Sequence, residues 1–194
     1  MKFPHFTQLD AMDCGPSCLR IVAAYYGRRY SLQRLRELCH ITREGVSLLG
    51  ISDAAEGIGF RTAGVKLTWR QLREEVTLPC IVHWNQRHFV VVYKIARSRG
   101  GWRVHVSDPA SGLLCYTEEQ FLRSWLRIAG DAPADPRGGV RSDAAGQGVA
   151  LLLEPRPEFY DEKGDEDRRL GFGSLLRYLR PYGGYLVQLA LAMG

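Results

Sequence analysis

The sequence from Cys14 to Gly27, CGPSCLRIVAAYYG, has the strongest secondary-structure pattern in the chain. Its apolar side chains recur at the spacing of one helix face, and they are Cys14, Cys18, Ile21, Val22 and Tyr25. Pro16 is tolerated there because backbone N–H groups in the first turn have no partner inside the helix. The pattern predicts a helix from Cys14 to Tyr26 that is ended by Gly27.

Capping residues mark the starts of further helices. An N-cap hydroxyl accepts a hydrogen bond from a free backbone N–H, and a glutamine three residues later completes a capping box. We expect helices from Ser31, as N-cap, to Cys39, from Thr68 (with Gln71) and from Thr117 (with Gln120) through Leu126. The apolar pattern indicates a further, weaker helix from Ser47 to Glu56.

The middle of the chain has the pattern of strands. The expected strands are Cys80 to Trp84, His88 to Ile95, Trp102 to Ser107 and a final buried strand, Gly148 to Leu153. Gly100-Gly101 is predicted as the hairpin turn between the second and third. Helices followed by hairpin-linked strands predict an α+β domain, in which N-terminal helices pack on an antiparallel sheet.

Composition and cysteine usage exclude several classes of protein. The chain of 194 residues is 45% hydrophobic and 24% charged, as is typical of a globular protein rather than a disordered one. The net charge is +5, but the arginines are scattered, which does not favour nucleic-acid binding. Five cysteines without a CxxC pair argue against a disulfide framework or a zinc ribbon and for a reducing compartment. Met1 to His5 lacks the apolar core of a signal peptide, so we expect a cytoplasmic domain.

The C-terminal part is expected to lie outside this domain. Gly130 to Gly148 is predicted as a long exposed loop, and the domain is expected to cover residues 1–159. A charged linker at 160–174 and the start of a truncated transmembrane domain at 175–194 would follow, with arginines near the start of that segment. The apolar run from Tyr185 is shorter than the roughly 20 residues of a membrane span, and an amphipathic or docked terminal helix is the alternative.

Cys14 is the candidate nucleophile. At the first turn of a helix, free N–H groups and the positive end of the helix dipole favour a thiolate. Gly15 is expected to leave the backbone beside the sulfur open to a substrate peptide. The alternative role, a buried structural cysteine, is assigned to Cys18, Cys39, Cys80 and Cys115.

A cysteine nucleophile needs a base, and His88 is the candidate. It stands where a polar loop enters an apolar strand, so the sheet would hold it while substrate can reach it. His83 lies within the preceding strand and is interpreted as structural. His105 alternates with two valines and is expected to face solvent.

Asp108 and Gln8 are the candidates that complete the site. Alternation puts Asp108 on the apolar face of its strand, where a carboxylate needs a partner such as an imidazole on the neighbouring strand. Taken alone, Asp108-Pro109 is more typical of a turn. Gln8 could hold the oxyanion of a reacting carbonyl together with the Cys14 backbone N–H, although a lone glutamine is also typical of a surface.

The run from Gln8 to Leu19, QLDAMDCGPSCL, resembles the family C39 cysteine peptidases, the papain-like domains of bacterial ABC transporters that export bacteriocins and related peptides. Three further segments fit in the same order: PCIVHW from Pro79, HFVVV from His88 and DPASG from Asp108. In that family the cysteine, histidine and aspartate form a catalytic triad, and the glutamine lines the oxyanion hole. The resemblance covers about Phe6 to Phe159 and places these roles on Cys14, His88, Asp108 and Gln8.

The resemblance also implies a substrate and partners. The expected substrate is the leader region of a precursor peptide, cut after Gly-Gly or Gly-Ala. The expected partner is the rest of a homodimeric ABC transporter in the bacterial inner membrane, with this domain on the cytoplasmic side and ATP and Mg²⁺ only on its nucleotide-binding domain. The peptidase domain itself is expected to need no metal or cofactor. Residues suggested for the leader groove, with core packing as the alternative, are Leu48, Leu49, Ile51, Val65 and Leu67.

Two other functions stay open. A C39-like domain could recruit a cargo peptide without cutting it, because peptide recognition and catalysis are separable. A papain-like transferase or amidase would instead consume a small thiol or amine acceptor.

Overall fold

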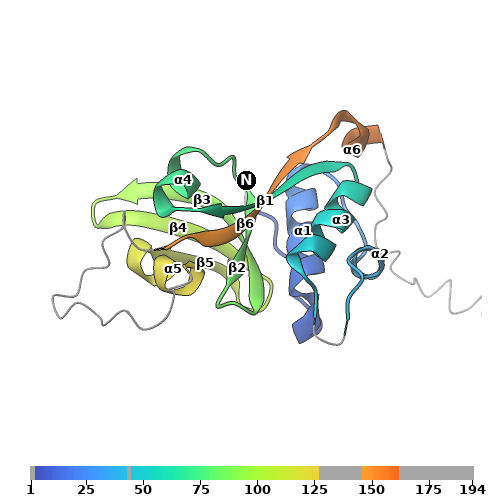
Figure 1. The fold of residues 1–194 in the computed structure, drawn as a ribbon, viewed down its shortest axis with the longest axis horizontal. Coiled ribbons are helices and arrows are strands. Elements are labelled where there is room, and N and C mark those ends of the chain that lie inside the picture. Colours follow the sequence, from blue (N-terminus) through green and yellow to red (C-terminus); the bar gives the residue numbers. More distant parts are fainter. Residues whose placement is uncertain (1–2, 43–44, 127–145, 162–194) are drawn as a thin grey trace, which may run out of the picture.

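The computed structural model describes residues 3–42, 45–126 and 146–161. Figure 1 shows a group of helices that packs beside a sheet. Further helices lie against the sheet on the side away from this group. The first group consists of the short helix η1 (Ala11–Asp13) and of α1 (Cys14–Tyr25), α2 (Leu32–Leu38) and α3 (Leu48–Gly57). The helices α4 (Trp69–Glu74) and α5 (Glu118–Trp125) lie with the sheet, and α6 (Pro157–Asp161) follows its last strand.

The sheet has six strands in the order β1-β6-β2-β3-β4-β5. They are β1 (Phe60–Leu67), β2 (Cys80–Trp84), β3 (His88–Ser98), β4 (Gly101–Asp108), β5 (Gly112–Thr117) and β6 (Gly148–Pro155). All neighbouring strands are antiparallel. The predicted α+β class, with N-terminal helices on an antiparallel sheet, is confirmed.

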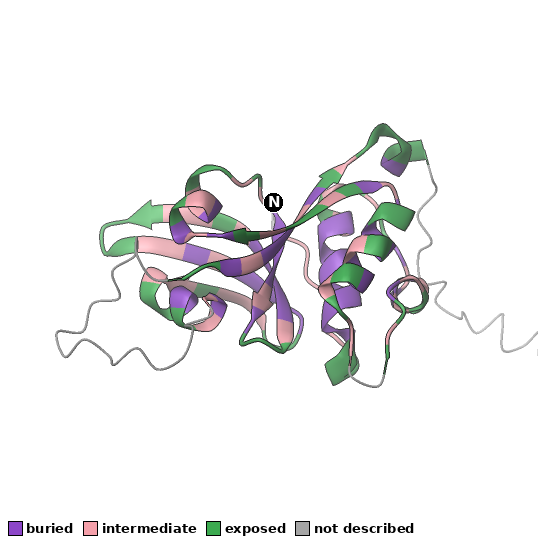
Figure 2. Ribbon diagram, in the orientation of Figure 1, coloured by how far each residue is buried: buried purple, intermediate pink, exposed green. Residues whose placement is uncertain are grey.

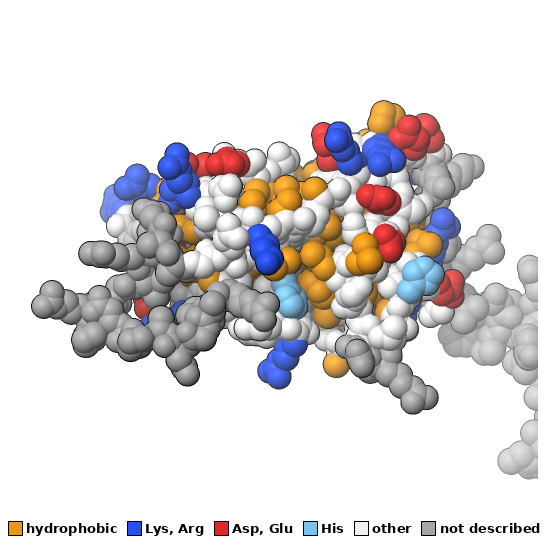
Figure 3. Space-filling model, in the orientation of Figure 1, with side chains coloured by type: hydrophobic (Ala, Val, Ile, Leu, Met, Phe, Trp, Pro, Cys, Tyr) orange, Lys and Arg blue, Asp and Glu red, His pale blue; other side chains and the backbone are white. Residues whose placement is uncertain are grey.

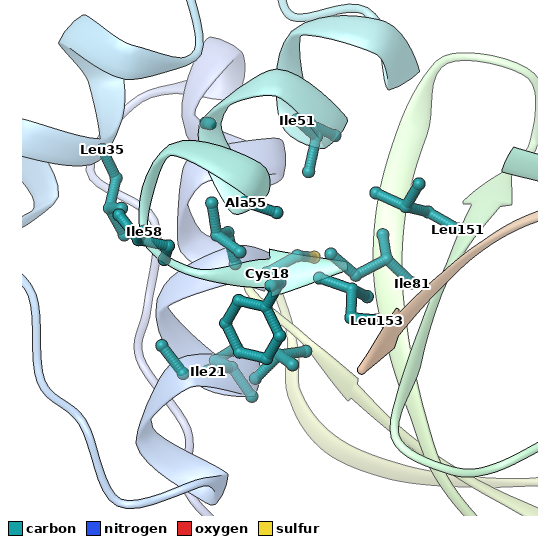
Figure 4. Packing of buried hydrophobic residues seen from close by; sticks show 14 of the residues in the cluster. Cys18, Ile21, Leu35, Ile51, Ala55, Ile58, Ile81, Leu151 and Leu153 are labelled. Atoms are coloured by element: carbon teal, nitrogen blue, oxygen red, sulfur yellow. The ribbon is translucent and has the colours of Figure 1, made fainter. Parts of the chain in front are cut away.

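A hydrophobic core packs against each of the two faces of the sheet. The helix-side core joins α1, α2 and α3 to the sheet; Figure 4 labels Cys18, Ile21, Leu35, Ile51, Ala55, Ile58, Ile81, Leu151 and Leu153. On the opposite face, aromatic side chains of α4 and α5 pack against a second set of valines. In β3, Phe89 and Val91 belong to the first core, and Val90 and Val92 belong to the second. Burial on both faces explains why this strand is continuously apolar from Phe89 to Val92 (Figure 2).

The predicted helix starts are confirmed by their caps. Hydroxyls of Ser31, Ser47, Thr68 and Thr117 each accept a hydrogen bond from the backbone N–H three residues later. The two predicted capping boxes are both formed. Gly27 follows the end of α1 with φ +90°, a backbone conformation that favours glycine.

The prediction of the sheet needs two corrections. Strands β1 and β5 were not expected; β1 contains a glycine and β5 alternates poorly, so neither has a clear period-two pattern. The hairpin turn lies at Arg99-Gly100, because Gly101 already pairs with Ser98. Gly148, which was expected both to end the long loop and to begin the final strand, is the first residue of β6.

The remaining predictions for the C-terminal part lie mostly outside the described residues. They include most of the 130–148 loop, the 160–174 linker beyond Asp161 and the apolar segment 175–194. Within the described ranges, no helix has the length and apolar character needed to cross a membrane.

Candidate active site

Cys14 is the first residue of α1, and its side chain is almost fully covered, at 5% exposure. One turn further on, Cys18 lies on the same helix face, and its thiol donates a hydrogen bond to the backbone oxygen of Phe89 at 3.2 Å. Phe89 directly follows His88 in β3. The Cys18–Phe89 bond therefore aligns the start of α1 with the start of β3, which sets Cys14 beside His88.

His88 and Asp108 meet at the same end of two paired strands. Because Val91 pairs with Ser107, the position opposite Asp108 is Val90, and His88 lies two residues earlier on the same side. His88 Nε2 lies 2.7 Å from Asp108 Oδ1. The strand register therefore supplies the carboxylate with the imidazole partner that its burial requires.

Asp108 also closes a turn, so both sequence interpretations of this residue describe its geometry. Its Oδ1 accepts a hydrogen bond from the Ala110 backbone N–H at 2.9 Å, and its backbone oxygen accepts one from Ser111 N–H at 3.1 Å. Burial raises the pKa of Asp108, but hydrogen bonds from His88 and Ala110 outweigh it and hold the pKa below its usual value. The turn therefore orients the carboxylate, and His88 together with the turn favours its ionised form.

The charge of His88 depends on both of its neighbours. Burial lowers the pKa of this imidazole, but hydrogen bonds with Asp108 and Cys14 outweigh burial and raise the pKa to about 9. Since Nε2 faces Asp108, Nδ1 is the ring nitrogen left for the thiol. An imidazolium held between a carboxylate and a sulfur can stabilise a thiolate and later donate a proton.

Gln8 is hydrogen-bonded through its backbone to the turn that follows Asp108. Its N–H donates a hydrogen bond to the carbonyl oxygen of Pro109, the residue after Asp108, at 2.9 Å. Its side-chain Oε1 is buried without a hydrogen-bond partner in the described part of the chain. The backbone bond thus fixes Gln8 at the end of the sheet that carries His88 and Asp108, next to the turn that follows Asp108.

Of the two other histidines in the sheet, His83 lies as expected and His105 does not. His83 is half-buried and stacks on Phe89, with 5.0 Å between the ring centres, as a structural role requires. His105 was expected to face solvent but is half-buried beside Tyr93, at 5.9 Å between ring centres. Burial and the nearby Lys94 lower its pKa.

The four cysteines interpreted as structural fall into two groups. Cys18, Cys39 and Cys80 are buried, and desolvation raises the pKa of each thiol, to about 12 for Cys39 and Cys80. Cys115 is exposed, and its interpretation as a buried cysteine is wrong. It lies on β5, which ends the sheet and has only half-covered or exposed residues.

The expectation for Gly15 is also wrong. This residue is buried, and a Cβ atom there would lie 2.4 Å from Val46 Cγ1 and 2.8 Å from Ile51 Cδ1. Glycine at this position lets α1 approach α3 closely and does not open the backbone to a substrate.

The residues suggested for the leader groove differ in how far they are buried. Ile51 and Leu67 belong to the hydrophobic cores, as the core-packing alternative held, and Leu48 and Val65 are half-buried against them. Leu49 is 69% exposed. On the face shown in Figure 3, hydrophobic side chains gather across the middle of the molecule, where the helices meet the sheet.

Sequence reasoning missed two polar contacts near the site. Asp13, beside Cys14, is buried and ion-paired with Arg36 of α2; the D-x-x-D spacing from Asp10 signals its capping box but not this ion pair. His5 Nδ1 lies 3.0 Å from the hydroxyl of Ser107, and nothing in the local sequence signals this long-range contact. Among the described residues, no cluster of three or more His, Cys, Asp or Glu side chains is arranged to hold a metal ion.

Comparisons with known proteins point to one family. Its sequence model, peptidase C39, matches residues 2–129. The lactococcin-G-processing and transport ATP-binding protein LagD of Lactococcus lactis is 34% identical over 128 residues, which are 62% of this chain and 17% of LagD. The colicin V secretion/processing ATP-binding protein CvaB of Escherichia coli is 32% identical over 128 residues, or 66% of this chain and 18% of CvaB.

A solved structure extends the similarity to the fold. It is that of a double glycine motif protease from an AMS/PCAT transporter in complex with the leader peptide, with a TM-score of 0.64 and 29% identity. The match covers 80% of this chain and 93% of that protease, and it confirms the predicted papain-like fold. The chain spans less than a fifth of the length of either curated relative.

Proposed function

Because this chain belongs to the peptidase C39 family, we propose that it is a cysteine endopeptidase with Cys14 as its nucleophile. The observation that carries the proposal is the hydrogen-bonded series from Cys14 through His88 to Asp108. In this proposal His88 is the general acid and base, Asp108 orients it, and Gln8 stabilises the oxyanion.

The reaction would proceed in two stages. The Cys14 thiolate attacks the peptide carbonyl carbon, and the Gln8 carboxamide and the Cys14 backbone N–H bind the oxygen as it becomes negative. The His88 imidazolium donates its proton to the leaving amine as the C–N bond breaks, which leaves a thioester on Cys14. Water then attacks that thioester, His88 accepts the water's proton, and the C–S bond breaks to release the acid.

The substrate proposed for this site is a leader peptide cut after Gly-Gly or Gly-Ala. The similar solved protease is described as a double glycine motif enzyme bound to a leader peptide. The burial of Cys14 supports the same preference, because a peptide that reaches a thiol with 5% exposure must have little side-chain bulk at the cut. Leader recognition would precede cleavage through an amphipathic helix in an apolar groove.

The proposal extends to the protein around the domain. Both curated relatives are transport and processing ATP-binding proteins, and each is much longer than this chain. We place the domain, residues 1–159, on the cytoplasmic side of a bacterial inner membrane, within a homodimeric ABC transporter that exports the cleaved cargo. Residues 160–174 would link it to a transmembrane domain beginning at 175–194. ATP and Mg²⁺ would act only on a separate nucleotide-binding domain, and the peptidase itself would need no cofactor.

The decisive experiment is incubation of the protein with a synthetic peptide whose amphipathic leader ends in Gly-Gly, followed by mass spectrometry. We expect a single cut after the second glycine, no cut by Cys14→Ala, and no cut of a matched peptide with leucine in place of that glycine. Binding of the peptide without products, measured by fluorescence anisotropy, would overturn the peptidase in favour of a recruiting module. Unchanged turnover by Cys14→Ala would overturn the assigned nucleophile.

A further inference from the structure

The segment of residues 3–8, named here the N-terminal arm, contains no helix or strand but is anchored to the sheet at three points. The Phe3 ring stacks on Tyr93 of β3, with centres 4.1 Å apart and planes 9° from parallel. His5 Nδ1 lies 3.0 Å from Ser107 Oγ. The third anchor is the backbone hydrogen bond from Gln8 to Pro109 at 2.9 Å.

The same arm also contacts α1. Phe3 lies 5.4 Å from the Tyr25 ring, between centres, near the end of that helix. Phe6 packs under the guanidinium of Arg20, whose carbon is 4.4 Å from the ring centre. The arm therefore lies against both the helices and the sheet, along the line where these two parts meet.

The sheet contacts of the arm converge on Asp108. Ser107 is completely buried and directly precedes Asp108, and Pro109 directly follows it. His5 and Gln8 thus bind the two residues on either side of the carboxylate that holds His88. Any displacement of the arm moves Gln8 relative to Asp108 and His88.

We propose that Phe3 and His5 are positioning residues that hold Gln8 where its carboxamide can bind the oxyanion. The proposal rests on the proposed function, which gives Gln8 that role. Oxyanion donors act only when held within about 0.5 Å of the productive position, and a segment without helix or strand needs anchors to achieve this. The three anchors of the arm provide that restraint, and they lie within six residues of Gln8.

The test compares arm variants in two backgrounds. In the wild-type background, we expect His5→Ala and Phe3→Ala to lower kcat on the Gly-Gly leader peptide about 10-fold, with KM little changed, because a donor misplaced by a fraction of an ångström is lost mainly in the transition state. His5→Asn keeps a polar atom for Ser107 and should recover most of the loss. His40→Asn, an exposed histidine whose positive φ suits asparagine, is the matched control and should not change kcat.

In the Gln8→Ala background, the same arm variants should cause less than a further twofold loss, because the group that they position is absent. Equal losses in the two backgrounds would overturn the proposal, as would an arm variant with unchanged kcat. Alkylation of Cys14 by iodoacetamide should keep its rate in all arm variants. A slowed alkylation would show damage to the nucleophile rather than displacement of Gln8, and would also count against the proposal.

Hydrogen exchange separates this inference from the proposed function. The Gln8 amide should be protected in the wild-type protein by its bond to Pro109 and should lose that protection in His5→Ala, while the β3 amides stay protected. If the wild-type protein cleaves no leader peptide but the Gln8 amide follows this pattern, the proposed function fails and the anchoring of Gln8 stands. If the Gln8 amide stays equally protected from exchange in both arm variants, Phe3 and His5 do not anchor Gln8.

Discussion

Arg36 binds the carboxylate of Asp13 through two nitrogens, with Nε 2.7 Å from Oδ1 and Nη2 2.5 Å from Oδ2. The same carboxylate accepts a hydrogen bond from the Asp10 backbone N–H at 2.9 Å, inside the capping box of η1. The hydrogen bonds from Arg36 lower the pKa of Asp13 although burial opposes them. This pair joins the residue before Cys14 to α2 and fixes the turn between Gln8 and the thiol.

Arg36→Met should therefore destabilise the fold. The substitution leaves the Asp13 carboxylate, which is 2% exposed, without its cationic partner, and an unpaired buried charge costs about 3 kcal/mol. Urea unfolding measures the loss. The double variant Asp13→Asn/Arg36→Met is the control and should recover part of the stability, because the buried group is then neutral. A double variant at least as unstable as Arg36→Met would show that the methionine itself does the damage.

Stability should fall as the pH rises from about 6.5 to about 9. The folded-state pKa of His88 lies near 9, above the ordinary value of 6.5, so the folded state binds this proton more tightly than the unfolded state does. The resulting stabilisation is complete below the unfolded pKa and is lost as the pH rises through the folded one. The shift corresponds to about 3 kcal/mol, and denaturant unfolding across this range measures it.

His88→Gln is the control for that measurement, because it removes the titrating group while keeping a polar side chain. Its unfolding free energy should change much less between pH 6.5 and 9 than that of the wild-type protein. An equal slope in the two proteins would mean that another group carries the titration.

Asp108→Asn should uncouple the imidazole from the thiol. The charge that helps to raise the pKa of His88 is lost, while the asparagine can still accept the Ala110 N–H hydrogen bond that shapes the turn. We expect the His88 pKa, followed by NMR, to fall below 9, and kcat to fall about 100-fold. Asp53→Asn, on the exposed surface of α3, is the matched control and should change neither quantity. A His88 pKa that stays near 9 in Asp108→Asn would contradict the argument.

Local signals explain which parts of this fold could be predicted. Helix caps at Ser31, Thr68 and Thr117 depend on neighbouring residues alone, and each was predicted at the right position. The helix after Ser47 was predicted at the right start, but its cap was not named. The strand β3 could be recognised by its apolar run. In contrast, β1 contains Gly64 and is mostly exposed or half-buried, so its pairing with β6 determines its structure more than its own pattern does.

The site shows the same division between local and long-range information. The proximity of His88 and Asp108 follows from alternation along two paired strands, and alternation can be read from sequence. The Arg36–Asp13 ion pair and the His5–Ser107 contact join residues 23 and 102 positions apart, and no local pattern specifies them. Gly15 was misread because its neighbours, Val46 and Ile51, belong to an approach between two helices that only the tertiary fold creates.

Gly15→Ala should destabilise the domain through that helix approach. A Cβ atom 2.4 Å from Val46 Cγ1 forces α1 and the residues before α3 apart, and overpacking of this kind costs about 1–3 kcal/mol. Thermal unfolding measures it. Gly57→Ala in α3 is the control, because the nearest atom to its Cβ is Leu38 Cδ2 at 4.0 Å and alanine favours helix. Combining Gly15→Ala with Val46→Ala should recover part of the stability, because Ile51 Cδ1 still lies 2.8 Å from the added Cβ. A double variant as unstable as the two single losses added together would show that Val46 is not an obstacle.

Labelling of the thiols should separate the five cysteines by environment. At pH 7, iodoacetamide should modify Cys14 and Cys115 and leave Cys18, Cys39 and Cys80 unmodified, because burial excludes the reagent from these three and raises their pKa values. Mass spectrometry of peptides identifies the modified residues. Cys115 is expected to react because it is exposed on β5, whereas Cys14 is expected to react although it is covered, because its sulfur is hydrogen-bonded to the His88 imidazole.

His88→Ala distinguishes these two causes of reactivity within one molecule. It should slow the modification of Cys14 while Cys115, which is remote from the imidazole in the fold, keeps its rate and serves as the internal control. A Cys14 that reacts no faster than the three buried cysteines in the wild-type protein would contradict its activation. A parallel decrease at Cys14 and Cys115 would indicate a global change in the fold rather than the loss of an imidazolium, since Cys115 reacts through its exposure alone.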